Sequence, residues 1–167
     1  LNIMQPGQDL TDITSKILQE LKKLFQGYKP DMILVHGDTS SALAASLAAY
    51  YHAIPVAHVE AGLRTGNLYS PWPEEANRKI TAVLSSLHFA PTMTSRANLN
   101  AEGYFEDSIK VTGNTVIDSL LHVNSMIEED ANLEKEILIS LPFYRSDRPF
   151  VLITGHRRES FGDGFER

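Results

Sequence analysis

The chain has 167 residues, of which 43% are hydrophobic and 22% are charged, as in an ordinary soluble globular protein. Its formal charge of -6 and the lack of a Lys/Arg cluster argue against nucleic acid as a partner. The absence of cysteine excludes a disulfide framework and a thiolate metal site, and no apolar run reaches the roughly 18 residues of a membrane span, so we expect a cytoplasmic protein.

Helical and strand-like patterns alternate along the chain. In chain order they predict a helix at 9–26, a strand at 32–37, a helix at 38–51, a strand at 55–59, a helix at 74–86, a strand at 87–90, a helix at 92–102, a strand at 108–112, a helix at 115–128 and a buried strand at 148–154. The strand at 32–37 has no polar alternation, as expected of a parallel strand covered on both faces. The order of elements therefore predicts an α/β protein with a Rossmann-like parallel sheet and helices on both faces.

A polar, proline-bearing stretch separates the last expected strand from the rest of the chain. It predicts an N-terminal domain over 1–130, a connection over 131–147 and the start of a second domain over 148–167. The chain begins at Leu1 without an initiator methionine and stops where a further helix is expected. We therefore interpret it as a fragment.

Polar motifs directly follow four of the expected strands. They are His36-Gly-Asp-Thr39, Glu60-Ala-Gly62, Gly113-Asn114 and Gly155-His-Arg-Arg-Glu159. Ligands of such sheets bind beyond the carboxyl ends of the strands, so these motifs are expected to line one site. The stretch from His58 to Arg78 is too polar for a core element and too rich in Gly and Pro for a plain surface helix.

Each candidate residue also has an interpretation without function. Asp38 suits the N-cap of the helix that it precedes, and Glu74 and Glu75 suit a first helical turn. A carboxylate such as Glu60 at the end of a buried strand is costly unless it is paired or used. Arg64 is a candidate partner for these carboxylates.

The remaining basic groups and glycines leave several interpretations open. Arg78 is a second candidate partner for the carboxylates, and the segment His156-Arg-Arg158 suits either an anion site or an exposed loop. His58 and Glu60 lie two residues apart without a third ligand, which argues against a metal site. The isolated glycines form neither a dinucleotide fingerprint nor a Walker loop.

Five motifs in one order carry a family resemblance. They are His36-Gly-Asp-Thr39, His58-Val-Glu-Ala-Gly-Leu-Arg-Thr-Gly66, Pro71-Trp-Pro-Glu-Glu-Ala-Asn-Arg78, Thr112-Gly-Asn-Thr-Val-Ile-Asp118 and Thr154-Gly-His-Arg-Arg-Glu159. From about Met32 onwards the sequence resembles the non-hydrolysing UDP-N-acetylglucosamine 2-epimerases of bacteria. The resemblance implies two Rossmann-like domains in the GT-B arrangement with the active site between them. The first strands of the N-terminal domain and most of the second domain would then be missing.

The resemblance also implies a reaction and its residues. UDP-GlcNAc and UDP-ManNAc would interconvert through elimination of UDP to 2-acetamidoglucal, without a cofactor or a metal, to supply ManNAc for cell-surface polysaccharide. It assigns catalytic roles to Asp38, Glu60, Glu74 and His156 and substrate contacts to Arg64 and Arg158. A homodimer and a second, activating UDP-GlcNAc are further expectations from the family.

Three other functions stay open on the sequence alone. A hydrolysing epimerase would share the fold and the intermediate but release free ManNAc. A GT-B glycosyltransferase would require an acceptor. The chain by itself could also be a catalytically inert binding or dimerisation domain, because one domain cannot close a cleft between two.

Overall fold

The computed structural model describes residues 1–144 and 147–153. By its contacts the chain divides into two compact units, Leu1–Gly113 and Asn114–Arg167. Within the described residues, no helix combines the length and the apolar character that crossing a membrane requires.

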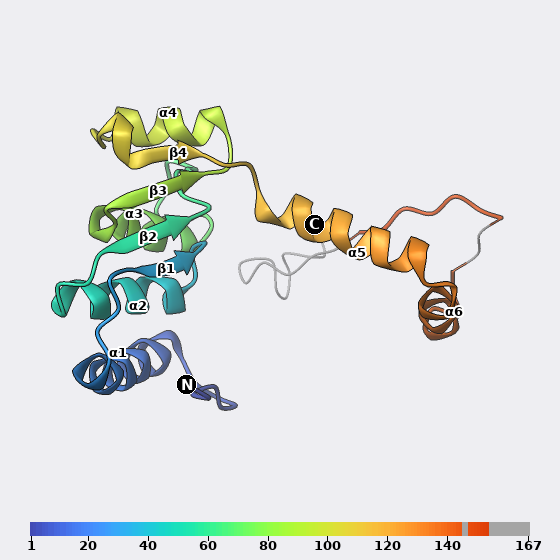
Figure 1. Ribbon diagram of the computed structural model, residues 1–167, viewed down its shortest axis with the longest axis horizontal. Helices are drawn as coiled ribbons and strands as arrows, with labels where there is room; N and C mark the ends of the chain where they lie inside the picture. Colours follow the sequence, from blue (N-terminus) through green and yellow to red (C-terminus); the bar gives the residue numbers. More distant parts are fainter. Residues whose placement is uncertain (145–146, 154–167) are drawn as a thin grey trace. The chain divides into compact units, whose positions relative to one another are not determined.

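The first unit is built on a parallel sheet of four strands (Figure 1). The strands β1 (Ile33–His36), β2 (Val56–Val59), β3 (Leu87–Ala90) and β4 (Ile109–Val111) lie side by side in chain order. Between them run α2 (Ser40–Tyr51), α3 (Glu74–Leu84), α4 (Met93–Ala101) and the short 3-10 helix η1 (Glu106–Ser108), and α1 (Leu10–Gly27) precedes β1. The expected α/β class with a parallel sheet is confirmed, and each expected element up to 112 is present with its ends shifted by at most two residues.

Three helices of the first unit, α1, α2 and α4, begin at side-chain caps, whereas α3 has no such cap. Asp9 and Asp12 form a reciprocal capping box at the start of α1. Thr39, and not Asp38, caps α2, because its hydroxyl accepts a hydrogen bond from the backbone N–H of Ala42 at 3.2 Å. The interpretation of Asp38 as a simple cap is therefore wrong, and its carboxylate is free for other contacts.

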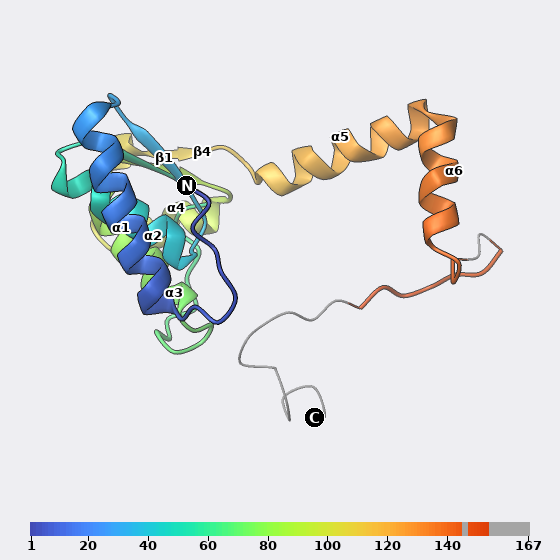
Figure 2. The ribbon, with the colours of Figure 1, turned by 90° about the horizontal axis from the view of Figure 1, so that it is seen from below.

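One face of the sheet carries the core. Right-handed crossovers between parallel strands in sequential order place the connecting helices on a single face, and Figure 2 shows α1, α2 and α3 together on one side of the strands. The neighbouring residues Val35, His58, His88 and Ile109 form one row across the four strands, and all are buried.

The edge strand β1 departs from the expectation of cover on both faces. Leu34, which alternates with buried Val35, is 67% exposed. The prediction is wrong here because β1 lies at the edge of the sheet. The helices α1, α2 and α3 cover the face that carries Val35, and within the described residues of the first unit the face that carries Leu34 has no helix on it at β1. An apolar run therefore indicated the strand correctly but not what covers it.

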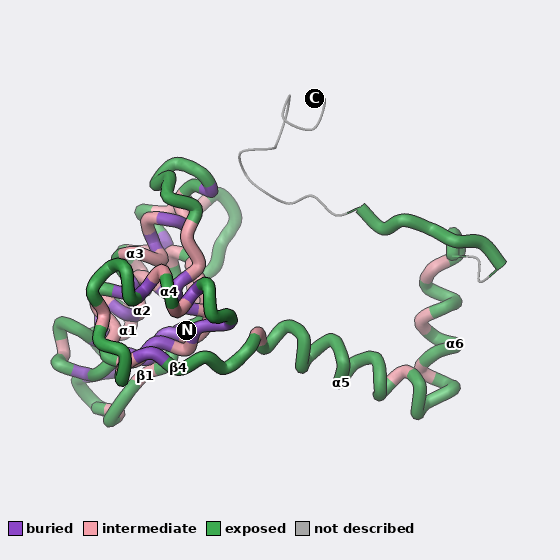
Figure 3. The backbone as a smooth tube through the Cα atoms, turned by 90° about the horizontal axis from the view of Figure 1, so that it is seen from above, coloured by how far each residue is buried: buried purple, intermediate pink, exposed green. Residues whose placement is uncertain are grey.

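The second unit has little buried surface among its described residues (Figure 3). The helix α5 (Thr115–Glu129) starts at an Asn114 cap, and α6 (Ala131–Ser140) starts at Asp130, whose side chain accepts from the N–H groups of Asn132 and Leu133. Neither helix contains a buried residue. The α6 helix lies where only a polar connection was expected, and the acidic cap before an apolar-spaced run is the signal that was overlooked.

The last expected strand is not formed in residues 148–153. These residues have no regular structure, and Phe150, Val151, Leu152 and Ile153 are between 66% and 86% exposed. The prediction of a buried strand is wrong for this segment because no described strand pairs with it, and a strand gains its hydrogen bonds only from a neighbour. The domain boundaries expected at 130 and 147 stay predictions.

Candidate active site

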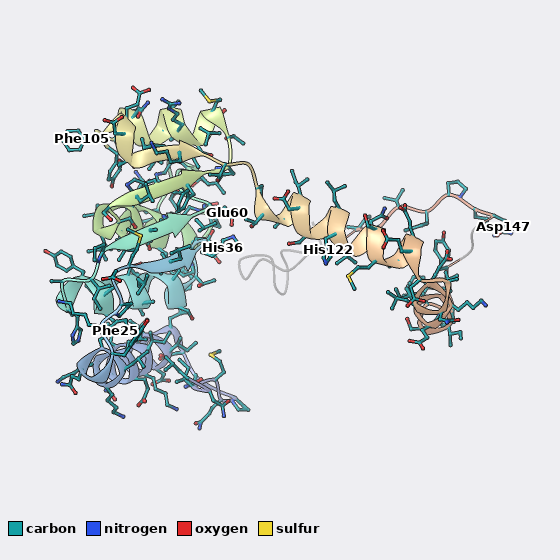
Figure 4. All side chains as sticks on the ribbon, viewed as in Figure 1. Phe25, His36, Glu60, Phe105, His122 and Asp147 are labelled. Atoms are coloured by element: carbon teal, nitrogen blue, oxygen red, sulfur yellow. The ribbon has the colours of Figure 1, made fainter. Side chains whose placement is uncertain are left out.

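The carboxyl ends of β1 and β2 bring His36 and the predicted site residue Glu60 to one edge of the sheet. The backbone N–H of Gly37 donates to the carbonyl of Val59 at 3.0 Å, which holds the two strand ends together. Directly beyond this bond, His36 Nε2 lies 3.2 Å from Glu60 Oε2 (Figure 4). Both side chains reach solvent, with 54% of His36 and 29% of Glu60 exposed, so this pair is open to a ligand.

The backbone of Glu60 has an unusual conformation. Its φ is 66°, in the left-handed region that residues with a Cβ seldom adopt. Such a conformation persists only where the surrounding structure enforces it, and it is found most often at functional sites. This supports the functional interpretation of Glu60 that its place at a strand end suggested.

Asp38 is held by α3 from two directions. Its carboxylate contacts the Arg78 guanidinium through Oδ2 and Nη2. Its backbone carbonyl accepts a hydrogen bond from the side-chain amide of Asn77 at 2.8 Å. The other end of the guanidinium faces a second carboxylate, with Arg78 Nη1 3.8 Å from Glu75 Oε2. One turn of α3 thus fixes both the backbone and the side chain of Asp38.

Adjacent glutamates in the first turn of α3 have different surroundings. Glu75 is fully buried, and its carboxylate accepts hydrogen bonds from the backbone N–H groups of Thr65 at 3.1 Å and Gly66 at 3.2 Å. Glu75 is therefore committed to the protein, whereas Glu74 is partly exposed and its buried Oε2 has no donor among the described residues.

Arg64 is committed to an acid partner at the C-terminal end of α4. Its Nε and Nη2 donate to the two carboxylate oxygens of Glu102 at 2.8 and 2.7 Å, and Lys79 Nζ donates to the same carboxylate at 3.2 Å. The hydrogen bond from Arg64 is the main cause that lowers the pKa of Glu102. Only 8% of the Arg64 side chain is exposed. The geometry favours the acid-partner interpretation of Arg64, and its contact with a substrate stays a prediction.

The loop after β2 is also held at Gly62. The backbone there has φ +85°, and a Cβ would lie 2.3 Å from the carbonyl oxygen of Ser95. The Asn98 side chain donates to the Gly62 carbonyl at 2.9 Å. Glycine is required because α4 approaches the loop too closely for any side chain. The loop that starts at Glu60 is therefore fixed by α4 as well as by Glu75.

His58 faces the core instead of the ligand edge. It is fully buried, and its Nε2 lies 2.8 Å from the carbonyl oxygen of Gly37. Burial is the main cause that lowers its pKa, and burial also lowers the pKa of the neighbouring His88 to about 4. Both rings are therefore neutral at physiological pH. His58 supports the turn between β1 and Asp38 through its hydrogen bond.

Two site residues were missed from the sequence, and two predicted ones lie outside the described residues. Glu75 and Asn77 were not among the predicted site residues. The helical spacing places Glu75 on the same face of α3 as the buried Ala82, and this was the signal for its burial. His156 and Arg158 belong to the part of the chain that the structure does not describe. Within 1–144 and 147–153, no group of three or more His, Asp or Glu residues is placed to hold a metal ion.

The chain is similar to proteins of one family throughout its length. A family model described as UDP-N-acetylglucosamine 2-epimerase matches residues 1–167. The probable UDP-N-acetylglucosamine 2-epimerase of Ralstonia nicotianae is 59% identical over 100% of this chain and 44% of that protein. The UDP-N-acetylglucosamine 2-epimerase of Escherichia coli K12 is 58% identical over 99% of this chain and 44% of that protein.

Solved structures agree with the sequence relatives. UDP-GlcNAc 2-epimerase from Neisseria meningitidis, bound to UDP-GlcNAc, has a TM-score of 0.94 and 51% identity, over 99% of this chain and 44% of that one. The Methanocaldococcus jannaschii enzyme in complex with UDP-GlcNAc and UDP has a TM-score of 0.75 and 41% identity, over 81% of this chain and 36% of that one. The chain thus spans less than half the length of these relatives.

Proposed function

The chain belongs to the UDP-N-acetylglucosamine 2-epimerase family, and we propose that the whole protein interconverts UDP-GlcNAc and UDP-ManNAc by inverting carbon 2 of the sugar. The observation that carries this proposal is the pair of carboxylates at adjacent strand ends, Asp38 and Glu60. Glu60 has a left-handed backbone and a solvent-open side chain, and Asp38 is held by an arginine. The activity is proposed for the whole protein because the chain spans 44% of its curated relatives.

The chemistry requires carboxylates because the hydrogen on carbon 2 is not acidic in the substrate. If the anomeric C–O bond breaks first, UDP leaves with the electron pair and an oxocarbenium-like centre makes the neighbouring hydrogen acidic. A carboxylate then accepts that proton, which gives 2-acetamidoglucal. In the return step UDP adds to the anomeric carbon and a proton is delivered to the opposite face of carbon 2. Substrate and product are isomers, so no oxidant or reductant is consumed.

The residues of the site suit these steps in different ways. We assign Asp38, Glu60 and Glu74 to stabilising the cationic sugar and moving the proton, as paired carboxylates do in glycoside hydrolysis. Glu74 is partly exposed in the first turn of α3, and its Oε2 has no donor among the described residues. His156 is assigned to the departing diphosphate, and Arg64 and Arg158 to substrate contacts, on the family resemblance. Two opposed faces of carbon 2 need at least two acid–base groups.

Several wider properties belong to the same proposal. The family resemblance supports a cytoplasmic homodimer in which each subunit has two Rossmann-like domains in the GT-B arrangement. It also supports a second UDP-GlcNAc as activator and delivery of ManNAc to cell-surface polysaccharide. The domain boundaries at 130 and 147 are retained in that arrangement. The 167-residue chain alone is expected to turn over poorly, because it would supply one wall of the cleft.

Identification of the product tests this proposal against its alternatives. The whole protein is incubated with UDP-GlcNAc, and the products are separated by anion-exchange chromatography and assigned by proton NMR. UDP-ManNAc as the main product is the expected result. Free ManNAc together with UDP would instead establish a hydrolysing epimerase, and product only after addition of an acceptor would establish a glycosyltransferase.

A further inference from the structure

Glu75 is a buried carboxylate to which the proposed reaction assigns no step. Its side chain is fully buried, so it cannot touch a substrate. A buried carboxylate is strongly unfavourable unless donors and a cation compensate it. Here the N–H groups of Thr65 and Gly66 supply the donors, and Arg78 Nη1, at 3.8 Å, supplies the cation.

Arg78 divides its guanidinium between two carboxylates. Nη1 faces Glu75, and Nη2 contacts Asp38. Arg64 provides a contrast within the same unit, because its Nε and Nη2 both donate to Glu102. Arg64 thus pairs with one carboxylate only, whereas the Arg78 side chain, 13% exposed, joins the buried Glu75 to a carboxylate at the ligand edge of the sheet.

We propose that Glu75 and Arg78 are positioning residues that set the orientation of the Asp38 carboxylate. Glu75 is fixed by the loop after β2, Arg78 is fixed by Glu75, and Asp38 is fixed by Arg78. The inference rests on the proposed function, in which Asp38 is a catalytic carboxylate. A planar guanidinium suits this role because it holds two carboxylates at defined angles, which an ammonium group does not.

The same contacts couple the two catalytic strand ends. The loop that binds Glu75 starts at Glu60, the proposed catalytic residue directly after β2. The helix turn that carries Arg78 also holds the backbone of Asp38 through Asn77. Glu75 therefore links the segment after Glu60 to the side chain of Asp38, and its loss should disturb both carboxylates without removing either.

The kinetic test is made on the whole protein with Arg78→Ala. We expect kcat to fall about 10- to 100-fold, the range for a misplaced catalytic group. The KM for UDP-GlcNAc should change much less, because a positioning residue acts on the catalytic group and not on substrate binding. Added methylguanidine should restore part of the lost kcat, and the kcat of Arg78→Lys should lie between those of wild type and Arg78→Ala.

Arg96→Ala is the matched control, because Arg96 on α4 pairs with exposed Glu106. It should show normal kcat and no response to methylguanidine.

A double variant separates positioning from a general loss of structure. In an Asp38→Asn background, adding Arg78→Ala should reduce kcat by less than about threefold, because residues that act as one unit are not additive. Losses that multiply, or an Arg78→Ala protein that methylguanidine does not improve, would overturn the inference.

A readout without turnover tests the anchoring step. Hydrogen exchange at the Thr65 and Gly66 amides should accelerate at least about tenfold in Glu75→Gln, because a neutral amide binds these donors less strongly than a carboxylate. The Arg96→Ala control should leave it unchanged. Unchanged exchange in Glu75→Gln would overturn the inference. Loss of the proposed function itself would appear differently, as a wild-type protein that forms no UDP-ManNAc.

Discussion

Residues 1–113 and the described part of 114–167 differ in what their apolar side chains contact. In the first unit Leu99, Val56 and Ile109 are at most 3% exposed, whereas in the second Leu120 and Leu121 on α5 are at least 60% exposed. Helical spacing predicted helices in both units. Periodicity identifies the helix, but burial also needs a second apolar surface, which a local pattern does not specify. The candidate carboxylates Asp38, Glu60 and Glu74 belong to the unit where that surface is present.

The largest expected effect is the loss of turnover when a glutamate of the first unit, and not one of the second, is replaced. In the whole protein, Glu60→Gln should reduce turnover of UDP-GlcNAc by about 10²–10⁴-fold, the range for a lost positioned acid or base. Folding should be nearly intact, because the Glu60 side chain is partly exposed and the amide is isosteric. Glu129→Gln, an exposed glutamate on α5, is the control and should keep wild-type turnover. Activity near wild type in Glu60→Gln would remove Glu60 from the mechanism.

A matched pair of leucines tests the contrast in packing. Leu99→Ala should lower the free energy of unfolding of the first unit by about 2–5 kcal/mol, because it empties a fully buried site. Leu120→Ala on α5 should change it by less than about 0.5 kcal/mol. Urea unfolding followed by fluorescence of Trp72, the single tryptophan, reports on the first unit directly. Equal effects of the two substitutions would contradict the contrast.

A matched pair of glycine substitutions compares the cost in stability of adding a side chain in the loop after β2 with the cost at the junction of the two units. Gly62 and Gly113 both have positive φ, but a Cβ would meet Ser95 only at Gly62, and open space surrounds Gly113. Gly113→Ala should cost about 1 kcal/mol of backbone strain. Gly62→Ala adds a steric clash and should cost about 3 kcal/mol in total. Thermal unfolding measures both, and similar losses would argue against the tight approach of α4 to the loop.

The buried His88 gives the first unit a defined dependence on pH. Its folded pKa of about 4 lies below the ordinary 6.5, so the unfolded chain binds the proton more readily. The contribution of neutral His88 to the free energy of unfolding is complete above pH 6.5. About 3 kcal/mol of it is lost as the pH falls towards 4. The free energy of unfolding of His88→Gln should fall less than that of wild type over this window. Parallel pH profiles of the two proteins would contradict the burial of a neutral His88.

The sequence predicted the architecture of the first unit because its signals are local. Apolar runs identified the strands, and parallel strands bring their carboxyl ends to one edge, so Asp38 and Glu60 were expected to be neighbours in space. The roles of Glu74 and Glu75 were harder to separate. They are adjacent in sequence but differ by about 100° around the helix. Glu75 therefore accepts hydrogen bonds from the backbone N–H groups of a loop, whereas Glu74 Oε2 has no donor among the described residues.

The errors fell where long-range packing decides the outcome. Residues 148–153 have the composition of a buried strand, but no described strand pairs with them. Leu34 is exposed on the uncovered face of an edge strand. The choice of Glu102 as the partner of Arg64 depends on the approach of α4, 38 residues away along the chain, which spacing within one motif does not reveal.

Proton exchange at carbon 2 tests the proposed chemistry most directly. The whole protein is incubated with UDP-GlcNAc in D₂O, and the sugar protons of the nucleotide sugars are followed by NMR. If carboxylates at the sheet edge remove and return the proton, UDP-ManNAc appears with deuterium at carbon 2. UDP-ManNAc that keeps protium at carbon 2, or a wild-type protein that forms no UDP-ManNAc, would contradict the proposed proton transfer by these carboxylates.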